Sequence, residues 1–148
     1  MKRFAALLLT VLAAPLASSA APEYPINPGY WEATYDWLGL YTTTDRYCVE
    51  PKNITSFLAK PCNHIYHCNY PVAAYKDGKV HFEGTIAGRN ELYYVNGGGA
   101  YSPTEFSMHA SAHGHWKIMP VPKVDLWIKG RFLGETCPPG AKHFHQRS

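Results

Sequence analysis

The sequence predicts an all-β protein: a single antiparallel, strongly curved sheet or a small, partly closed barrel, with one short helix and disulfide staples. Three observations lead to this prediction. Apolar and polar residues alternate over most of the chain after residue 29, which is the period of half-buried strands. Turn residues separate these runs at short intervals, as in antiparallel all-β folds. Four cysteines stand in the same region.

The alternating runs predict about seven strands, mostly in hairpin order. In residues 30–37 the odd positions are apolar or aromatic, and residues 105–118 repeat this alternation. Asp77-Gly78 separates two such runs and is the strongest short hairpin signal in the chain. Residues 96–99, Asn-Gly-Gly-Gly, are expected to form a flexible turn and not a phosphate loop, because no lysine follows them.

A short helix is predicted where the alternation stops, over residues 51–59. Pro51 suits the first helical position, since its missing N–H has no partner there in any case. Two helical turns would then place Ile54, Phe57 and Leu58 on one side. Pro61 is expected to end the helix.

The start of the chain has the pattern of a secretory signal. Lys2 and Arg3 precede an apolar run over residues 4–16, and small residues follow up to Ala20, where we expect cleavage. The run is shorter than the ~20 apolar residues that a bilayer span needs. We therefore expect a periplasmic or secreted protein. The predicted divisions are a signal peptide (1–20), a single β domain (21–137) and a polar flexible tail (138–148).

The charge of the predicted mature chain is nearly balanced. Losing Lys2 and Arg3 from the fourteen basic side chains would leave twelve, against eleven acidic ones. Binding of nucleic acid needs a basic surface, so no nucleic-acid partner is expected. No second apolar run predicts a stable membrane span after signal cleavage. The expected partner is a small molecule or an envelope protein.

The four cysteines are Cys48, Cys62, Cys68 and Cys137. An even number in an exported chain indicates two disulfides, and the C-x2-C spacing of structural zinc sites is missing. If residues 62–70 form one strand, the α-carbons of Cys62 and Cys68 lie ~20 Å apart, against the ~7 Å that a disulfide tolerates. We therefore prefer Cys48–Cys62 with Cys68–Cys137, and the connectivity stays open.

Several short motifs resemble the DUF3617 family of small exported bacterial proteins. They are Pro-Gly-Tyr-Trp-Glu at 28–32, Tyr-Cys-Val-Glu-Pro at 47–51, Cys62, and Gly-Glu-Thr-Cys at 134–137. The resemblance implies an exported β domain and supplies no catalytic residues. One departure is that members often carry a cysteine near the position of Thr85, whereas this chain has Cys68 in the preceding strand.

The abundant aromatic residues are the first candidates for ligand binding. Trp31, Tyr35 and Trp37 share one face of their predicted strand, and Trp127 stands on the charged side of another. Large aromatics ordinarily fill the core of a small β domain. A curved sheet with an aromatic concave face can instead hold an apolar ligand. Binding of such a ligand, or of an envelope component, is the leading functional hypothesis, with these four residues as its candidates.

The histidines suggest an alternative, a protein that binds a transition metal. His109, His113 and His115 project from one face of a predicted strand. Histidines two apart on a strand lie ~6.5–7 Å apart and can chelate Zn²⁺ or Cu²⁺. The same residues also suit the solvent-facing side of an amphipathic strand. Beyond this possible metal, no cofactor is expected.

Catalysis finds little support in the sequence. The acidic residues are scattered and not paired as in glycosidases. No serine stands in a G-x-S-x-G setting, and the cysteines are better explained as disulfides than as nucleophiles. We expect a non-enzymatic protein. A further alternative is a hydrolase whose site assembles only in three dimensions.

Overall fold

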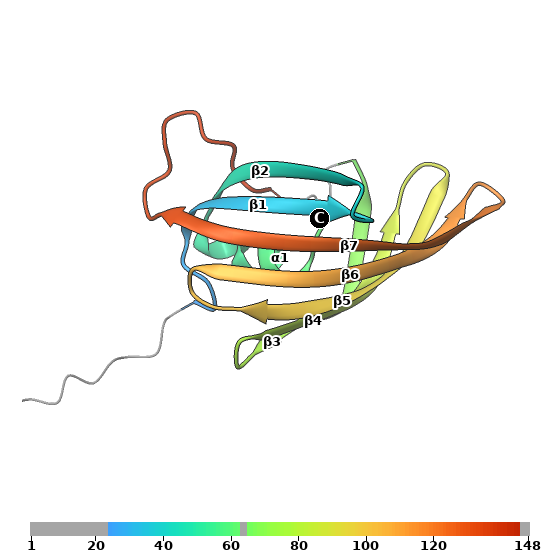
Figure 1. The fold of residues 1–148 in the computed structure, drawn as a ribbon, viewed down its shortest axis with the longest axis horizontal. Coiled ribbons are helices and arrows are strands. Elements are labelled where there is room, and N and C mark those ends of the chain that lie inside the picture. Colours follow the sequence, from blue (N-terminus) through green and yellow to red (C-terminus); the bar gives the residue numbers. More distant parts are fainter. Residues whose placement is uncertain (1–23, 63–64, 146–148) are drawn as a thin grey trace, which may run out of the picture.

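The computed structural model describes residues 24–62 and 65–145, so the predicted signal peptide over 1–20 lies outside the described residues. Seven strands form one antiparallel sheet in the order β2-β1-β7-β6-β5-β4-β3 (Figure 1). This confirms the predicted fold class, and the sheet is not closed into a barrel. The elements are β1 (Gly29–Trp37), β2 (Tyr41–Val49), the 3-10 helix η1 (Pro51–Asn53), α1 (Ile54–Ala59), β3 (His67–Lys76), β4 (Lys79–Ala87), β5 (Glu91–Tyr101), β6 (Glu105–Trp116) and β7 (Met119–Gly134).

Strand β1 is the exception to hairpin order, because it pairs with both β2 and β7. Ala33, for example, lies opposite Asp45 of β2 and Gly130 of β7. The other five strands follow one another as neighbours from β3 to β7. The first and last strands of the domain therefore lie side by side. Within the described part of the chain, no helix is long and apolar enough to cross a bilayer.

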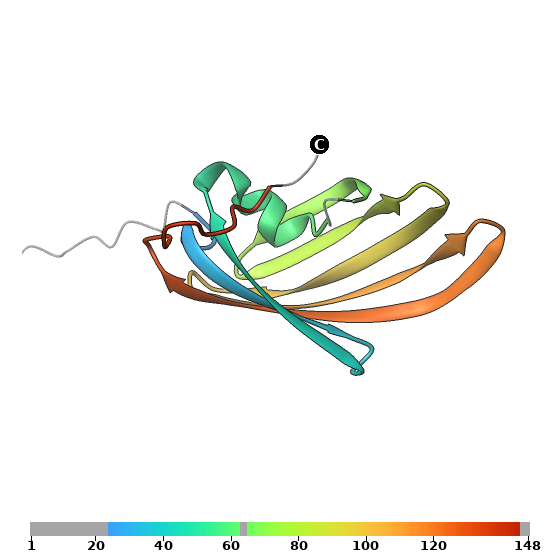
Figure 2. The same cartoon turned by 90° about the horizontal axis from the view of Figure 1, so that it is seen from above.

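The core lies between the concave face of the sheet and α1 (Figure 2). The alternation in β1 turns Trp31 and Ala33 toward α1, and both are fully buried. Phe57 of α1 contacts the rings of Trp31 and Phe106, with centroid distances of 6.0 and 5.5 Å. Ile54 and Leu58 are buried beside Phe57, as the predicted helix requires. Helix α1 thus covers the end of the sheet where β1 begins.

The predicted turn over residues 96–99 is wrong, because these residues lie inside β5. Gly97 and Gly99 stand on the core side of that strand, opposite Phe82 and Val80 of β4. A β-carbon at Gly97 would lie 2.5 Å from the ring of Phe82, which is closer than real contacts allow. In this strand the glycines make room for neighbouring side chains and form no turn.

The preferred disulfide pairing is also wrong. The bonds join Cys48 to Cys137 and Cys62 to Cys68, with α-carbon separations of 5.7 and 6.0 Å. The exclusion of the second bond assumed an extended strand from residue 62, but β3 begins at His67 and a turn precedes it. Two disulfides indicate that the protein folds in an oxidising compartment.

The segment after Cys137, for which the sequence predicts a polar flexible tail over 138–148, is described as far as residue 145 and contacts the domain. Its backbone pairs with β2, since the N–H of Cys48 donates to the carbonyl of Lys142 and the N–H of Phe144 donates to the carbonyl of Cys48. The ring of Phe144 packs on Phe57 and Tyr47 at centroid distances of 5.0 and 5.7 Å. This one apolar side chain attaches the tail to the core.

Candidate functional site

The four aromatic residues predicted to bind a ligand do not form one site. Trp31 is fully buried and stacks on Phe106 at a centroid distance of 5.6 Å. Trp37 and Trp127 are 43 and 42% exposed, but they lie on opposite faces of the sheet. The strand register shows this, because Trp127 pairs with Asp36, the residue before Trp37, and side chains alternate along a strand.

Tyr35, the fourth predicted residue, belongs to a hydrogen-bonded group on the concave face. Its neighbour Tyr47 donates a hydrogen bond from its hydroxyl to Asp45, at 3.1 Å. Burial raises the pKa of Tyr35, and burial, with the nearby Tyr35 and Asp45, raises the pKa of Tyr47 strongly. Both phenols therefore stay neutral and act as hydrogen-bonding groups and not as bases.

The concave face changes from packed to exposed along each central strand. On β6, Phe106 and Met108 are buried, whereas Trp116 at the far end is 45% exposed. On β7, Ile128 is buried and Met119 is 52% exposed. Figure 2 shows the reason, since α1 lies over one end of the face and the β6–β7 hairpin runs far beyond it. We call the uncovered part the open concave surface; it consists of Trp37, Tyr41, Ala112, Trp116, Met119, Val121, Val124 and Leu126.

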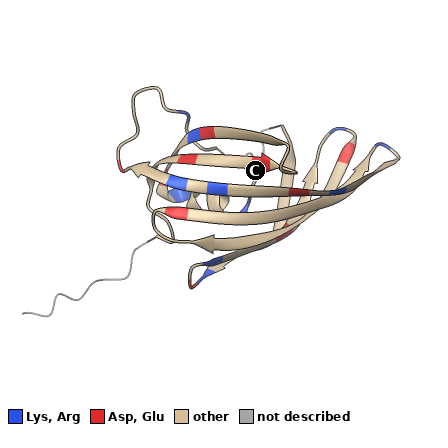
Figure 3. Ribbon diagram, in the orientation of Figure 1, with Lys and Arg blue, Asp and Glu red and all other residues tan. Residues whose placement is uncertain are grey.

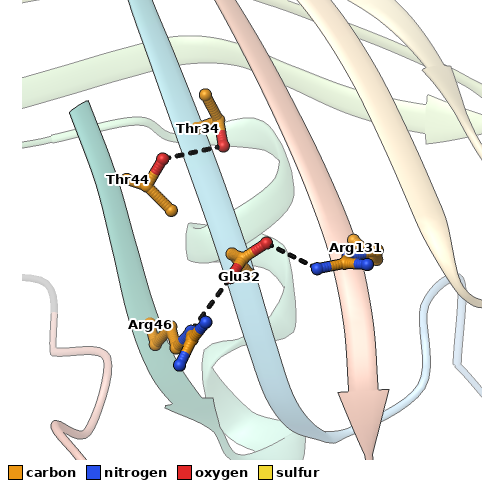
Figure 4. A network of polar contacts seen from close by, with 5 residues as sticks. All are labelled: Glu32, Thr34, Thr44, Arg46 and Arg131. Carbon is orange, nitrogen blue, oxygen red and sulfur yellow. Dashed lines mark hydrogen bonds and ion pairs between the residues drawn. The ribbon is translucent and has the colours of Figure 1, made fainter. Parts of the chain in front are cut away.

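The convex face is polar and carries a network of contacts across β2, β1 and β7. Glu32 accepts hydrogen bonds from Arg46 and Arg131, each at 2.9 Å, and the hydroxyls of Thr34 and Thr44 lie 3.2 Å apart (Figure 4). The hydrogen bonds from Arg131 and Arg46 hold the pKa of Glu32 below its usual value. Acidic and basic residues are interspersed along the strands (Figure 3), and the register places Glu32, Asp36, Lys129 and Arg131 together on this face.

Two hollows open on the convex face, at different places along the sheet. The first, the Trp127 hollow, has a volume of about 440 Å³ and lies over β2, β1 and β7. Residues that line it include Thr34, Asp36, Gly39, Thr42, Trp127 and Lys129. The second, the Tyr94 hollow, has a volume of about 450 Å³ and lies over β3 to β6. Residues that line it include Asn69, Glu83, Thr85, Tyr94, Asn96 and His113.

The histidines predicted to bind a metal have other partners. The ring of His109 lies 4.9 Å from that of Trp127, and its Nε2 lies 3.0 Å from the carboxylate of Asp125. His113 stacks on Tyr94 at 5.6 Å, and His115 is exposed further along β6. Residues 24–62 and 65–145 contain no group of three or more histidine, cysteine or acidic side chains placed to hold a metal ion.

The hydrolase alternative gains no support from hydrogen bonding. Ser111 lies opposite Asp125 on the neighbouring strand, and Asp125 contacts His109. Among the described residues, however, no hydrogen bond joins a serine to a histidine, and such a bond is what activates a serine nucleophile. The hydrolase alternative therefore stays a prediction without a named nucleophile.

Neither a family model, nor a curated protein, nor a solved structure matches the chain. The resemblance to the DUF3617 family stays a prediction from short motifs. Function must therefore be inferred from the two surfaces of the sheet, one apolar and concave, the other polar and convex.

Proposed function

We propose that this protein is an exported, non-enzymatic binding protein that holds an apolar ligand, such as an acyl chain, on the open concave surface. One observation carries the proposal. Trp37, Trp116 and Met119 are about half exposed on the face that forms the hydrophobic core elsewhere. Apolar surface left in water costs about 25 cal/mol per Å², so a ligand that covers these side chains gains their burial.

The shape and composition of the surface suit such a ligand. Binding sites for small molecules are usually concave and mostly apolar, with a few polar groups that fix orientation. Tyr35 and Thr43 lie opposite each other on β1 and β2. They are two residues along each strand from the apolar pair Trp37 and Tyr41, on the same face. Their hydroxyls offer hydrogen bonds to the polar end of a ligand, while the apolar part lies along β6 and β7.

The compartment supports the same role. Two disulfides favour an oxidising environment, and the predicted signal peptide favours the periplasm or the extracellular space. An apolar molecule is poorly soluble in such an aqueous compartment, and a binding protein of this kind would keep it in solution.

Titration of the purified, disulfide-bonded protein with laurate, followed calorimetrically, tests the proposal. We expect saturable binding that weakens about tenfold in Trp116→Ala, because this variant loses an aromatic ring that the ligand would cover. Trp37→Ala should behave in the same way. The matched control is Trp127→Ala, which removes an equally exposed tryptophan from the opposite face and should leave the affinity unchanged. Absence of saturable binding, or an equal loss in Trp127→Ala, would contradict the proposal.

A further inference from the structure

The two hollows of the convex face share one arrangement. In each, an aromatic ring that is about half exposed packs against a histidine of β6. Trp127 pairs with His109 at 4.9 Å and an interplanar angle of 32°, and Tyr94 pairs with His113 at 5.6 Å and 25°. Because the histidines are four residues apart on β6, the strand sets both the spacing and the common face of the two rings.

Polar side chains surround the ring in the Trp127 hollow. Thr34 and Thr42 supply hydroxyls, Lys129 supplies an ammonium and Asp36 supplies a carboxylate. Asp36 is held in place because its Oδ1 accepts a hydrogen bond from the backbone N–H of Gly39, at 2.9 Å. Together these groups both donate and accept hydrogen bonds beside one apolar ring.

The arrangement also fixes the orientation of Trp127. His109 approaches it from β6, and the carboxylate of Asp125 holds His109 at 3.0 Å. The hollow lies on the other side, toward β1 and β2. The indole therefore has one flank supported by protein and another flank facing the hollow.

The Tyr94 hollow repeats this chemistry with different residues. Asn69, Thr85 and Asn96 supply amide and hydroxyl groups beside the ring of Tyr94. Asn96 donates a hydrogen bond from Nδ2 to Glu83 at 3.1 Å, which orients both side chains. Both hollows thus combine one supported aromatic ring with neutral and acidic hydrogen-bonding groups.

This combination matches a carbohydrate ring better than other ligands. A sugar presents a face of C–H groups that stacks on an aromatic ring, and a rim of hydroxyls that both donate and accept hydrogen bonds. A wholly apolar ligand would leave the carboxylates and hydroxyls of the hollows without water or partners. A polyanion would need a surface of one charge, whereas Asp36 and Asp125 share this face with Lys129.

We propose that the convex face binds an oligosaccharide, with Trp127 and Tyr94 as two stacking platforms. Strand spacing and rise place the platforms, on β7 and β5 and four residues apart along β6, about 16 Å from each other. A ligand that reaches both rings must therefore be a chain of several sugars, one of which stacks on Trp127 and another on Tyr94. The site is independent of the open concave surface, because it lies on the other face of the sheet.

The test is calorimetric titration of the disulfide-bonded protein with cellotetraose and with chitotetraose. We expect saturable binding of at least one tetrasaccharide. Trp127→Ala and Tyr94→Ala should each weaken it about tenfold, because each removes one stacking contact. Trp127→Tyr keeps an aromatic ring and should retain most of the affinity. Trp37→Ala removes an equally exposed ring from the concave face and should change nothing.

Three results would overturn the proposal: no binding of either tetrasaccharide, binding that neither alanine variant weakens, or binding that depends on only one of the two rings. A circular dichroism spectrum like that of the unsubstituted protein shows that each variant is folded. Laurate binding by Trp127→Ala, measured on the same sample, separates failure of this site from failure of the concave one.

Discussion

The ring of Phe106 lies directly against Gly130 of the neighbouring strand. The two residues pair across β6 and β7, and a β-carbon at Gly130 would stand 2.0 Å from the ring. Phe106 stacks on Trp31 at the same place, with an interplanar angle of 28°. A glycine on the middle strand thus lets two large rings from its neighbours meet over it, and the core of the domain is built at this point.

We predict that Gly130→Ala lowers the free energy of unfolding by about 1–3 kcal/mol, because the added methyl group must displace Phe106. Urea unfolding measures the loss. The double variant Gly130→Ala/Phe106→Leu should lose less than the sum of the two single variants, since the smaller side chain relieves the clash. Additive losses would show that the two residues do not compete for the same space.

Glu32 should make the stability fall in acid. Hydrogen bonds from Arg131 and Arg46 hold the pKa of Glu32 in the folded protein below the usual 4.5. The contribution of Glu32 to the free energy of unfolding is therefore complete above about pH 4.5, and it is lost as the pH falls through the lowered pKa. We predict that Glu32→Gln is less stable at neutral pH and approaches the unsubstituted protein as the pH falls below the lowered pKa of Glu32. Urea midpoints across this range test it. Glu135→Gln is the control, because Glu135 forms none of the ion pairs found among the described residues.

The two disulfides should contribute unequally to stability. Cys48–Cys137 closes a sequence separation of 89 residues and Cys62–Cys68 one of 6. By chain entropy, removing the long bridge with paired alanine substitutions should cost about 4–5 kcal/mol, and removing the short one about 2 kcal/mol. Urea unfolding of each oxidised variant measures the difference. Equal losses would mean that local geometry, and not loop length, sets the contribution.

The tail should stabilise the domain through Phe144. We predict that Phe144→Ala lowers the free energy of unfolding by about 2 kcal/mol, because the ring packs on Phe57 and Tyr47 and is partly buried. The neighbouring His145 is exposed, so His145→Ala is the matched control. If both variants unfold at the same urea concentration as the unsubstituted protein, the ring of Phe144 does not contribute to stability.

The fold followed from periodicity because alternation reports directly which side of a strand is apolar. It predicted the strands and, by its interruption at Pro51, the helix. Periodicity does not predict which strands and cysteines pair in space, because that depends on where the chain turns. The disulfide prediction failed because it requires an extended segment before His67, where the chain turns. The prediction of a turn at the glycine run of β5 failed because the neighbours that explain Gly97, Phe82 and Ala110, lie on other strands.

For the candidate sites, the sequence predicted which face of the sheet a side chain lies on, but not which part of that face α1 covers. The sequence places Trp127 on the charged side of its strand, and in the structure this side chain is 42% exposed. Alternation placed Trp31 and Trp37 on one face, yet only the reach of α1 decides that the first is buried and the second open. The partners of His109 and His113 lie on adjacent strands, so their contacts depend on register, which no single strand reveals.

The position of β1 between β2 and β7 has a consequence for biogenesis. Strand β1 pairs with the last strand, β7, so it lacks its second neighbour until the chain is available as far as Gly134. Until then the β1–β2 hairpin carries an unpaired inner edge. Contacts between residues so distant in the sequence slow folding, because a long loop must close before they form.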